Sequence, residues 1–221
     1  MTAAPAAREN PAVAAPAALV HPYKLASVLL QYPTAALLAG LDELDAAARA
    51  CPRPGRDQLA GFLRWLRGTS PNEVAQHYVE TFDLRRRCAL YLTYYRHGDT
   101  RRRGMAMLAF NTAYRAAGLE PSRAELPDFL PLVLEFAALT PRGEELLRRH
   151  RAELELLRRA LHDAGTPYAA VADAVCAGLP RLGRRDLLRV RAAQDQGPPS
   201  EEVGLEPFAP PGYLTGRPEE P

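Results

Sequence analysis

Apolar residues recur at helical spacing through most of this chain, and that regularity is the feature that most constrains its fold. Leu59, Phe62, Leu63 and Leu66, for example, fall on one face of a helix. No segment alternates polar and apolar residues with a period of two, and no Asn-Gly or Asp-Gly pair separates two apolar runs. The pattern therefore predicts an all-α fold, a single-domain bundle of helices around one core.

Proline, glycine and serine mark the expected ends of these helices. Ser70, followed by Pro71 and by Glu73, is typical of a capping box at a helix N-terminus. Thr140 and the proline after it predict the start of one long helix that ends at Gly165. Each helix in such a bundle is joined to the next by a short connection.

Three further segments receive a helical interpretation. Cys88, Tyr91, Leu92 and Tyr95 predict a helical face that is closed by Gly98. The segment 126–139 is apolar on nearly every side, so we expect the most buried helix there. The segment that starts at 166 is expected to form the last helix.

Composition divides the chain into three parts. Residues 1–20 form an Ala/Pro-rich lead that we expect to be disordered, residues 21–190 form the helical domain, and residues 191–221 form a Pro/Glu-rich tail. The tail is too polar and too rich in proline to bury a core, so disorder is the favoured interpretation. Phe208, Tyr213 and Leu214 are the tail residues that could still dock on the domain or on a partner.

Charge and cysteine content exclude several classes of protein. The formal net charge is only +2, which does not favour a general attraction to nucleic acid. Cys51, Cys88 and Cys176 are far apart and form no C-x-x-C pair, so a zinc or dithiol site is not indicated. No apolar run reaches about 18 residues, so no stable membrane insertion is expected.

Motifs that carry catalysis are missing from the sequence. There is no phosphate-binding loop, no G-x-S-x-G nucleophile and no H-E-x-x-H pair. The five histidines show no spacing that would pair two of them as metal ligands. The sequence therefore predicts a protein that is not an enzyme and that holds no metal or cofactor.

The stretch HGDTRRRGMAM concentrates positive charge at the start of a helix. With Asp99 or Thr100 as the N-cap, residues 101–103 occupy the first helical turn, where the helix dipole disfavours cations. We therefore expect at least one of these arginines to pair with a carboxylate of the same chain. The candidate partners are Asp99, Glu80, Asp83 and Glu125.

Two aspartates have a structural interpretation. Asp83 follows an apolar helix face and should need a cationic partner, for which Arg85, Arg86 or Arg87 is at hand. Asp128 can cap the helix that follows it, because the proline at 131 lies in the first turn, where no amide hydrogen bond is lost.

Two motifs make the sequence resemble a known family. YVETFDLRRRCALYLTYYRHGDTRRRGMAMLAF, residues 78–110, and ELPDFLPLVLEF, residues 125–136, resemble the NarJ family within the wider TorD-like class. NarJ proteins are the delta-subunit assembly chaperones of respiratory nitrate reductase, and the resemblance covers about residues 22–180. Phe129 stands where the family pattern has histidine, so no role is assigned to a histidine there.

The resemblance implies an all-helical, cytoplasmic protein without catalytic activity. Such a protein binds the N-terminal segment of the apo catalytic (alpha) subunit, holds it for molybdenum-cofactor insertion and delays its attachment to the membrane. Proteins of cofactor insertion are further possible partners, and nucleic acid is not expected. The two motifs supply the expected client-binding residues, which are Tyr78, Glu80, Phe82, Asp83, His97, Asp99, Arg101, Arg103, Glu125 and Asp128.

Two alternatives remain open at the level of sequence. One is a helical regulator that binds nucleic acid through residues 85–87 and 101–103, which a steep salt dependence would reveal. The other is a chaperone for a different molybdoenzyme. Contact with a guanine nucleotide or with the cofactor itself is not decided by the residues.

Overall fold

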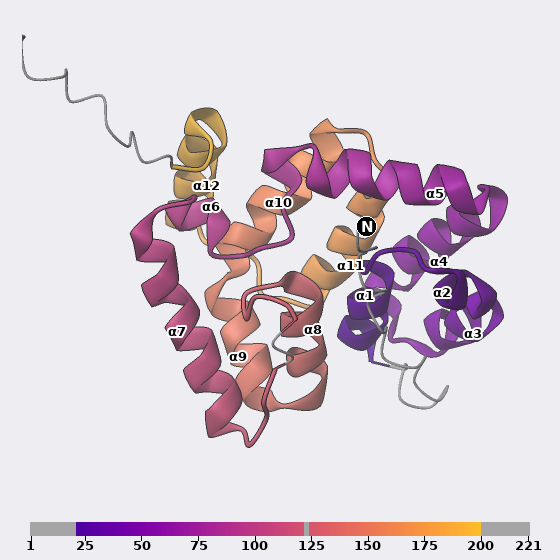
Figure 1. Ribbon diagram of the computed structural model, residues 1–221, viewed down its shortest axis with the longest axis horizontal. Helices are drawn as coiled ribbons and strands as arrows, with labels where there is room; N and C mark the ends of the chain where they lie inside the picture. Colours follow the sequence, from indigo (N-terminus) through magenta and orange to yellow (C-terminus); the bar gives the residue numbers. More distant parts are fainter. Residues whose placement is uncertain (1–20, 122–123, 200–221) are drawn as a thin grey trace, which may run out of the picture.

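The computed structural model describes residues 21–121 and 124–199, and these residues form an all-α structure (Figure 1). Within these described residues, the only β feature is an isolated antiparallel bridge that joins Tyr91 to Phe129. The predicted fold class is confirmed. The elements are α1 (Pro22–Leu29), α2 (Ala35–Ala39), α3 (Leu41–Ala50), α4 (Arg53–Gly68), α5 (Pro71–Tyr78), the π-helical turn η2 (Val79–Asp83), the 3-10 turn η3 (Arg86–Cys88), α6 (Tyr94–His97), α7 (Arg101–Ala116), α8 (Leu130–Leu139), α9 (Pro141–Arg149), α10 (Arg151–Asp163), α11 (Tyr168–Ala177) and α12 (Arg184–Gln196).

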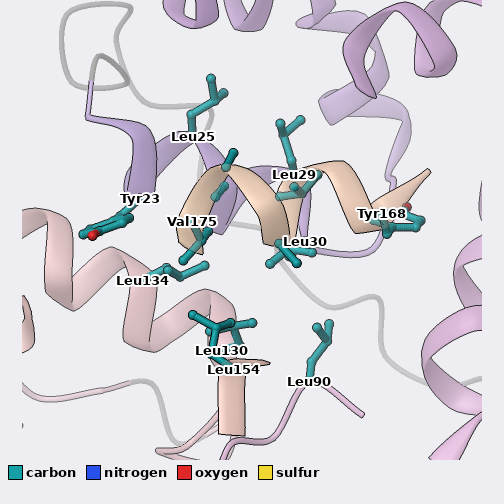
Figure 2. Packing of buried hydrophobic residues seen from close by; sticks show 14 of the residues in the cluster. Tyr23, Leu25, Leu29, Leu30, Leu90, Leu130, Leu134, Leu154, Tyr168 and Val175 are labelled. Atoms are coloured by element: carbon teal, nitrogen blue, oxygen red, sulfur yellow. The ribbon is translucent and has the colours of Figure 1, made fainter. Parts of the chain in front are cut away.

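The core lies where α1, α8 and α11 meet. Helix α11 packs on α4 on one side, and α8 packs on α9 on the other. Figure 2 shows side chains from these helices gathered in one apolar cluster, among them Leu29, Leu134 and Val175. A fully buried side chain of this size contributes about 1.5–3 kcal/mol, so this cluster is the main source of stability.

Helix α8 is the buried apolar helix that the sequence predicts, but it is shorter. It begins at Leu130 rather than at Leu126, which is 40% exposed. The residues at its start pair instead with the backbone of residues 90–92. The amide of Leu92 donates to the carbonyl of Asp128 at 3.1 Å, and the amide of Leu130 donates to the carbonyl of Leu90 at 2.7 Å. This short extended pairing replaces the first helical turn.

The same pairing overturns the helix predicted between Cys88 and Gly98. The structure has the 3-10 turn η3, then an extended stretch through Tyr91, and only then the single-turn helix α6. Aromatic residues at positions 91, 94 and 95 mimic a helical face, while their backbone is held by the segment before α8. Gly98 does end α6, as predicted.

Residues 140–165 form two helices instead of the predicted one. The capping hydroxyl of Thr140 accepts a hydrogen bond from the amide of Gly143 at 2.9 Å, as its sequence suggests. The helix then breaks at His150, whose ring lies 4.8 Å from that of Phe110 on α7. The break lets α9 pack on α8 and α7 while α10 packs on α11 and α12.

Helix α12 spans the boundary that the sequence analysis places at residue 190. It continues to Gln196, so the tail predicted from 191 starts inside a helix. Val190 is its one buried residue, which is too weak an apolar signal to be found in the sequence. The helix is fastened instead by polar contacts, in which Gln194 accepts from Arg159 at 3.3 Å and donates to Asp163 at 3.1 Å. The lead 1–20 and the tail residues Phe208, Tyr213 and Leu214 lie outside the described residues.

The capping box is confirmed. Ser70 Oγ accepts from the amide of Glu73 at 3.4 Å, and the Glu73 carboxylate accepts from the amide of Ser70 at 3.1 Å. In the part of the chain that the structure describes, no helix combines the length and the apolar character that crossing a bilayer requires.

Candidate functional site

The sequence-predicted site residues fall into two groups in the structure. We call the first the Tyr78 surface, which consists of Tyr32, Tyr78, Phe82, Leu84 and Leu126 with the carboxylates of Glu80, Asp83 and Glu125. We call the second the arginine cluster, which consists of Arg86, Thr93, Tyr94, Asp99, Arg103 and Asp128. His97 and Arg101 flank the arginine cluster along the chain.

Tyr78 is the buried centre of the first group. Its ring lies 4.8 Å from that of Phe82 and 5.5 Å, edge to face, from that of Tyr32. Its hydroxyl donates to the carbonyl of Leu30 at 3.2 Å. Tyr78 and Phe82 are therefore core residues. Tyr32, which is not among the expected client-binding residues, is in contact with Tyr78 and is 46% exposed.

Exposed leucines extend the apolar part of the Tyr78 surface. Leu84 is 71% exposed and Leu126 is 40% exposed. They directly follow Asp83 and Glu125 in the chain. An isolated exposed leucine is ordinary, but one that directly follows an expected client-binding residue is a candidate for contact with a partner.

Carboxylates are the second component of the Tyr78 surface. Burial, and then Tyr168, raise the pKa of the Tyr78 hydroxyl, and the negative charges of Asp83 and Glu125 add to the rise. Both carboxylates therefore lie close enough to act on the same hydroxyl. Glu80, on the same π-helical turn as Asp83, accepts from the side chain of Gln76 at 2.8 Å. The Tyr78 surface thus combines apolar and acidic side chains.

Asp128 is the buried centre of the arginine cluster. Its Oδ2 accepts from the amide of Thr93 at 3.1 Å and from the Thr93 hydroxyl at 2.5 Å. The predicted capping role is wrong, because Phe129 is the N-cap of α8 and the Asp128 side chain turns to Thr93 instead. Arg103 reaches the same group: its Nε donates to the Thr93 hydroxyl at 3.3 Å.

Arg103, one of the three consecutive arginines, is paired within the protein. Its Nη1 lies 3.6 Å from Asp99 Oδ1, and its Nη2 lies 3.7 Å from Asp128 Oδ2. Its guanidinium also lies over the rings of Tyr91 and Tyr94, at 5.3 and 5.8 Å from their centroids. Asp99 is a predicted partner, whereas Asp128 was not considered, and neither contact involves Glu80, Asp83 or Glu125.

A second arginine completes the cluster. Arg86 donates to the Tyr94 hydroxyl at 2.9 Å and to Asp99 Oδ2 at 2.8 Å. Asp99 thus bridges the two arginines, and the cluster ties η3, α6, α7 and the segment before α8 together. These contacts are all within the protein itself.

His97 lies beside this cluster, half-buried. Burial lowers the pKa of its imidazole, and the charges of Arg96 and Arg102 lower it further. Across the described ranges, no three His, Cys, Asp or Glu side chains come together as metal ligands. The first group is therefore a candidate binding surface, and the second is a set of contacts within the protein.

Comparison with solved structures shows that the fold is shared. It is similar to that of a protein described as a putative redox enzyme maturation protein from Archaeoglobus fulgidus, with a TM-score of 0.55 at 23% identity over 76% of this chain and 97% of the other. The sequence is more specific. Residues 48–173 match the family model of the nitrate reductase delta subunit, and the chain belongs to this family. The resemblance seen in the two motifs is confirmed.

Curated relatives have names that agree with this assignment. The chain is 46% identical over 156 residues to the nitrate reductase-like protein NarX of Mycobacterium tuberculosis, covering 70% of this chain but only 24% of NarX. It is 31% identical over 163 residues to the probable nitrate reductase molybdenum cofactor assembly chaperone NarJ of Bacillus subtilis, covering 72% of this chain and 89% of that protein. It is 36% identical over 154 residues to NarJ of Escherichia coli K12, of which it spans 65%. The two NarJ relatives are named as chaperones, in agreement with the prediction of a protein that is not an enzyme.

Proposed function

We propose that this chain is an assembly chaperone for respiratory nitrate reductase that acts in the cytoplasm. It binds the N-terminal segment of the apo catalytic subunit, holds that subunit for insertion of the molybdenum cofactor, and delays its attachment to the membrane. Proteins of cofactor insertion are its further partners. Membership of the delta subunit family supports the role, and the apolar and acidic Tyr78 surface is the observation that carries the mode of binding.

The Tyr78 surface suits an amphipathic helix with basic residues. The apolar face of such a helix would cover Tyr32, Leu84 and Leu126, as in other cases where a helix lies in a groove of its partner. Its basic side chains would meet the carboxylates of the Tyr78 surface, which favours fast and selective association. The buried Tyr78 below supplies a rigid base.

The arginine cluster acts in this proposal as a support for the surface. Arg86 and Arg103 are both engaged with Asp99 and with the Tyr94 side chain. A regulator that binds nucleic acid would present these side chains to phosphates. The contacts within the protein therefore favour the chaperone over that alternative.

Calorimetry with a synthetic peptide tests the proposal. The N-terminal 30 or so residues of the catalytic subunit should bind, and the affinity should fall about tenfold in Leu84→Ser. Met105→Ser, at an equally exposed residue on α7, is the matched control and should bind normally. Corresponding peptides from other molybdoenzymes address the alternative client. Absence of heat with every peptide up to about 1 mM, a binding energy near −4 kcal/mol, would contradict the proposal.

A further inference from the structure

Helix α7 carries an apolar face that is not covered by the described part of the chain. Of its 16 residues only Phe110 and Tyr114 are buried. Met105 is 71% exposed and Leu108 is 55% exposed. Ala109, Thr112 and Ala116 follow at helical spacing and are exposed as well. The helix lies along one side of the molecule, next to α9 (Figure 1).

A groove continues this face between α7 and α9. It has a volume of about 850 Å³ and is open to solvent. Small and aliphatic side chains line its floor, and charged side chains stand at its α9 edge. The lining residues are Ala109, Thr112, Ala113, Ala116, Pro141, Arg142, Glu145 and Arg149. Together with Met105 and Leu108 they form what we call the α7 surface.

The C-terminal end of the described chain lies at the start of α7. Gly98, three residues before that helix, contacts Pro199 so closely that a Cβ atom on Gly98 would lie 1.6 Å from the Pro199 carbonyl oxygen. Gly197 lies next to the guanidinium of Arg87, in the same region. The chain that leaves α12 is therefore brought to within a few residues of Arg101, the first residue of α7.

The 22 residues 200–221 that follow have the length and composition to cover this surface. An extended chain spans about 3.3 Å per residue, roughly 70 Å here, whereas a 16-residue helix is about 24 Å long. The segment contains Phe208, Tyr213 and Leu214, and five glutamates against the single Arg217. Its apolar residues match the exposed face of α7.

The charges of the α7 surface and of residues 200–221 are complementary. Exposed arginines lie at the α7 surface and beside it: Arg142 lines the groove, and Arg102 and Arg115 lie near the two ends of α7. The positive potential of these arginines would attract the acidic residues 200–221 along α7.

We propose that residues 200–221 of this chain dock in cis on the α7 surface, with their aromatic and aliphatic side chains over Met105 and Leu108. This surface shares no residue with the Tyr78 surface, so the proposal does not depend on the identity of the client. The α7 surface is then an internal interface of the full-length protein.

Oxidation of Met105 in the full-length chain tests the docking directly. Dilute hydrogen peroxide converts an accessible methionine to its sulfoxide, and mass spectrometry of the peptide 104–115 follows the rate. The variant Phe208→Ser/Leu214→Ser should be oxidised at Met105 at least threefold faster than the wild type. The control Ala209→Ser/Thr215→Ser, in the same stretch, should match the wild type. Added salt should accelerate the wild type toward the variant.

Each other outcome overturns the proposal. Equal rates in the wild type and in Phe208→Ser/Leu214→Ser would show that the segment does not cover Met105. Protection that increases with protein concentration, with dimers in sedimentation, would assign the α7 surface to a second copy of the chain. Binding of the client peptide is measured on the same samples, and because its site is the Tyr78 surface, its failure would leave the Met105 result standing.

Discussion

The Nη2 atom of Arg103 lies 3.7 Å from Oδ2 of Asp128, and this contact joins the first turn of α7 to the residue before the N-cap of α8. Both side chains are withdrawn from solvent: that of Arg103 is 16% exposed and that of Asp128 is fully buried. The second oxygen of Asp128 has no hydrogen-bond partner among the described residues. The buried carboxylate therefore depends on the nearby guanidinium for its charge balance.

Replacement of Arg103 by alanine should accordingly destabilise the protein strongly. Removal of one partner from a buried charged pair costs about 3–5 kcal/mol, because the other charge is left uncompensated. Arg102→Ala, at the exposed neighbouring position, should change the free energy of unfolding by less than about 0.5 kcal/mol. Urea denaturation at pH 7 measures both values.

The lysine variant separates charge from geometry. Arg103→Lys keeps the positive charge but loses the planar group that lies over Tyr91 and Tyr94 and reaches Thr93. It should recover only part of the lost stability. Equal stability of the alanine variant and the wild type would mean that the cluster does not brace the fold.

Glu155 offers a second matched pair of substitutions. Its buried carboxylate accepts from Arg151, Arg158 and Arg159, at distances of 2.8 to 3.1 Å. Glu155→Gln should cost about 3 kcal/mol, while Glu145→Gln, in an exposed pair with Arg149 at 3.0 Å, should cost about 0–1 kcal/mol. Thermal or urea unfolding of the two variants distinguishes them, and similar losses would contradict the assigned burial.

The same carboxylate makes stability depend on acid pH. Burial alone would raise the pKa of Glu155, but the hydrogen bonds from Arg158, Arg159 and Arg151 outweigh burial and lower the pKa to about 2. Because the folded-state pKa lies below the unfolded value of 4.5, this stability is present above pH 4.5 and is lost as the pH falls toward 2. The full loss is about 3 kcal/mol, and Glu155→Gln should lack this part of the pH profile.

Local signals predicted the helix caps well and the contacts between helices poorly. The capping box at Ser70 and the threonine cap at Thr140 depend on residues three apart, so the sequence shows them directly. The Thr93–Asp128 contact spans 35 positions, and periodicity says nothing about it. A hint was available, because an aspartate between proline and phenylalanine in an apolar stretch is a candidate for burial.

The sequence did not predict the break at His150 or the extended stretch at Tyr91, and the reason is related. In both places the residues keep helical spacing, yet the chain bends because other elements hold its backbone or side chains. The same limit applies to the candidate site. Tyr78 and Phe82 have the apolar character of either a core or a surface, and only the structure shows that they are buried while Tyr32 and Leu84 are exposed.

His150 should contribute its own pH dependence. Burial, and then the charges of Arg96, His97 and Arg149, lower its pKa to about 4 from 6.5. Because the folded-state pKa lies below the unfolded value, the unfolded state binds the proton first, and stability is lost as the pH falls from about 6.5 toward 4. The expected loss between pH 7.5 and pH 5 is about 2 kcal/mol.

A substitution isolates this histidine from its neighbour. Burial raises the pKa of Glu153, which makes a contribution of the opposite sign, lost as the pH rises. His150→Gln keeps Glu153 and removes the imidazole, so the difference in unfolding free energy between wild type and variant should shrink by about 2 kcal/mol from pH 7.5 to pH 5. A difference that stays constant over this range would show that His150 is not buried as described.

Gly98 allows the most local prediction. Its backbone angles, φ 55° and ψ −143°, lie close to a region that is essentially restricted to glycine, and its missing Cβ leaves room for Pro199. Gly98→Ala should therefore cost more than about 2 kcal/mol, since it adds backbone strain and displaces residues 197–199.

Gly118 is the control, because it also has a positive φ, 72°, but nothing lies within 4 Å of its Cβ position. Gly118→Ala should cost only about 1 kcal/mol, the strain alone. Hydrogen exchange should also show faster opening at the end of α12 in Gly98→Ala and no change there in Gly118→Ala; equal behaviour of the two variants would mean that the contact with Pro199 adds nothing to the need for glycine.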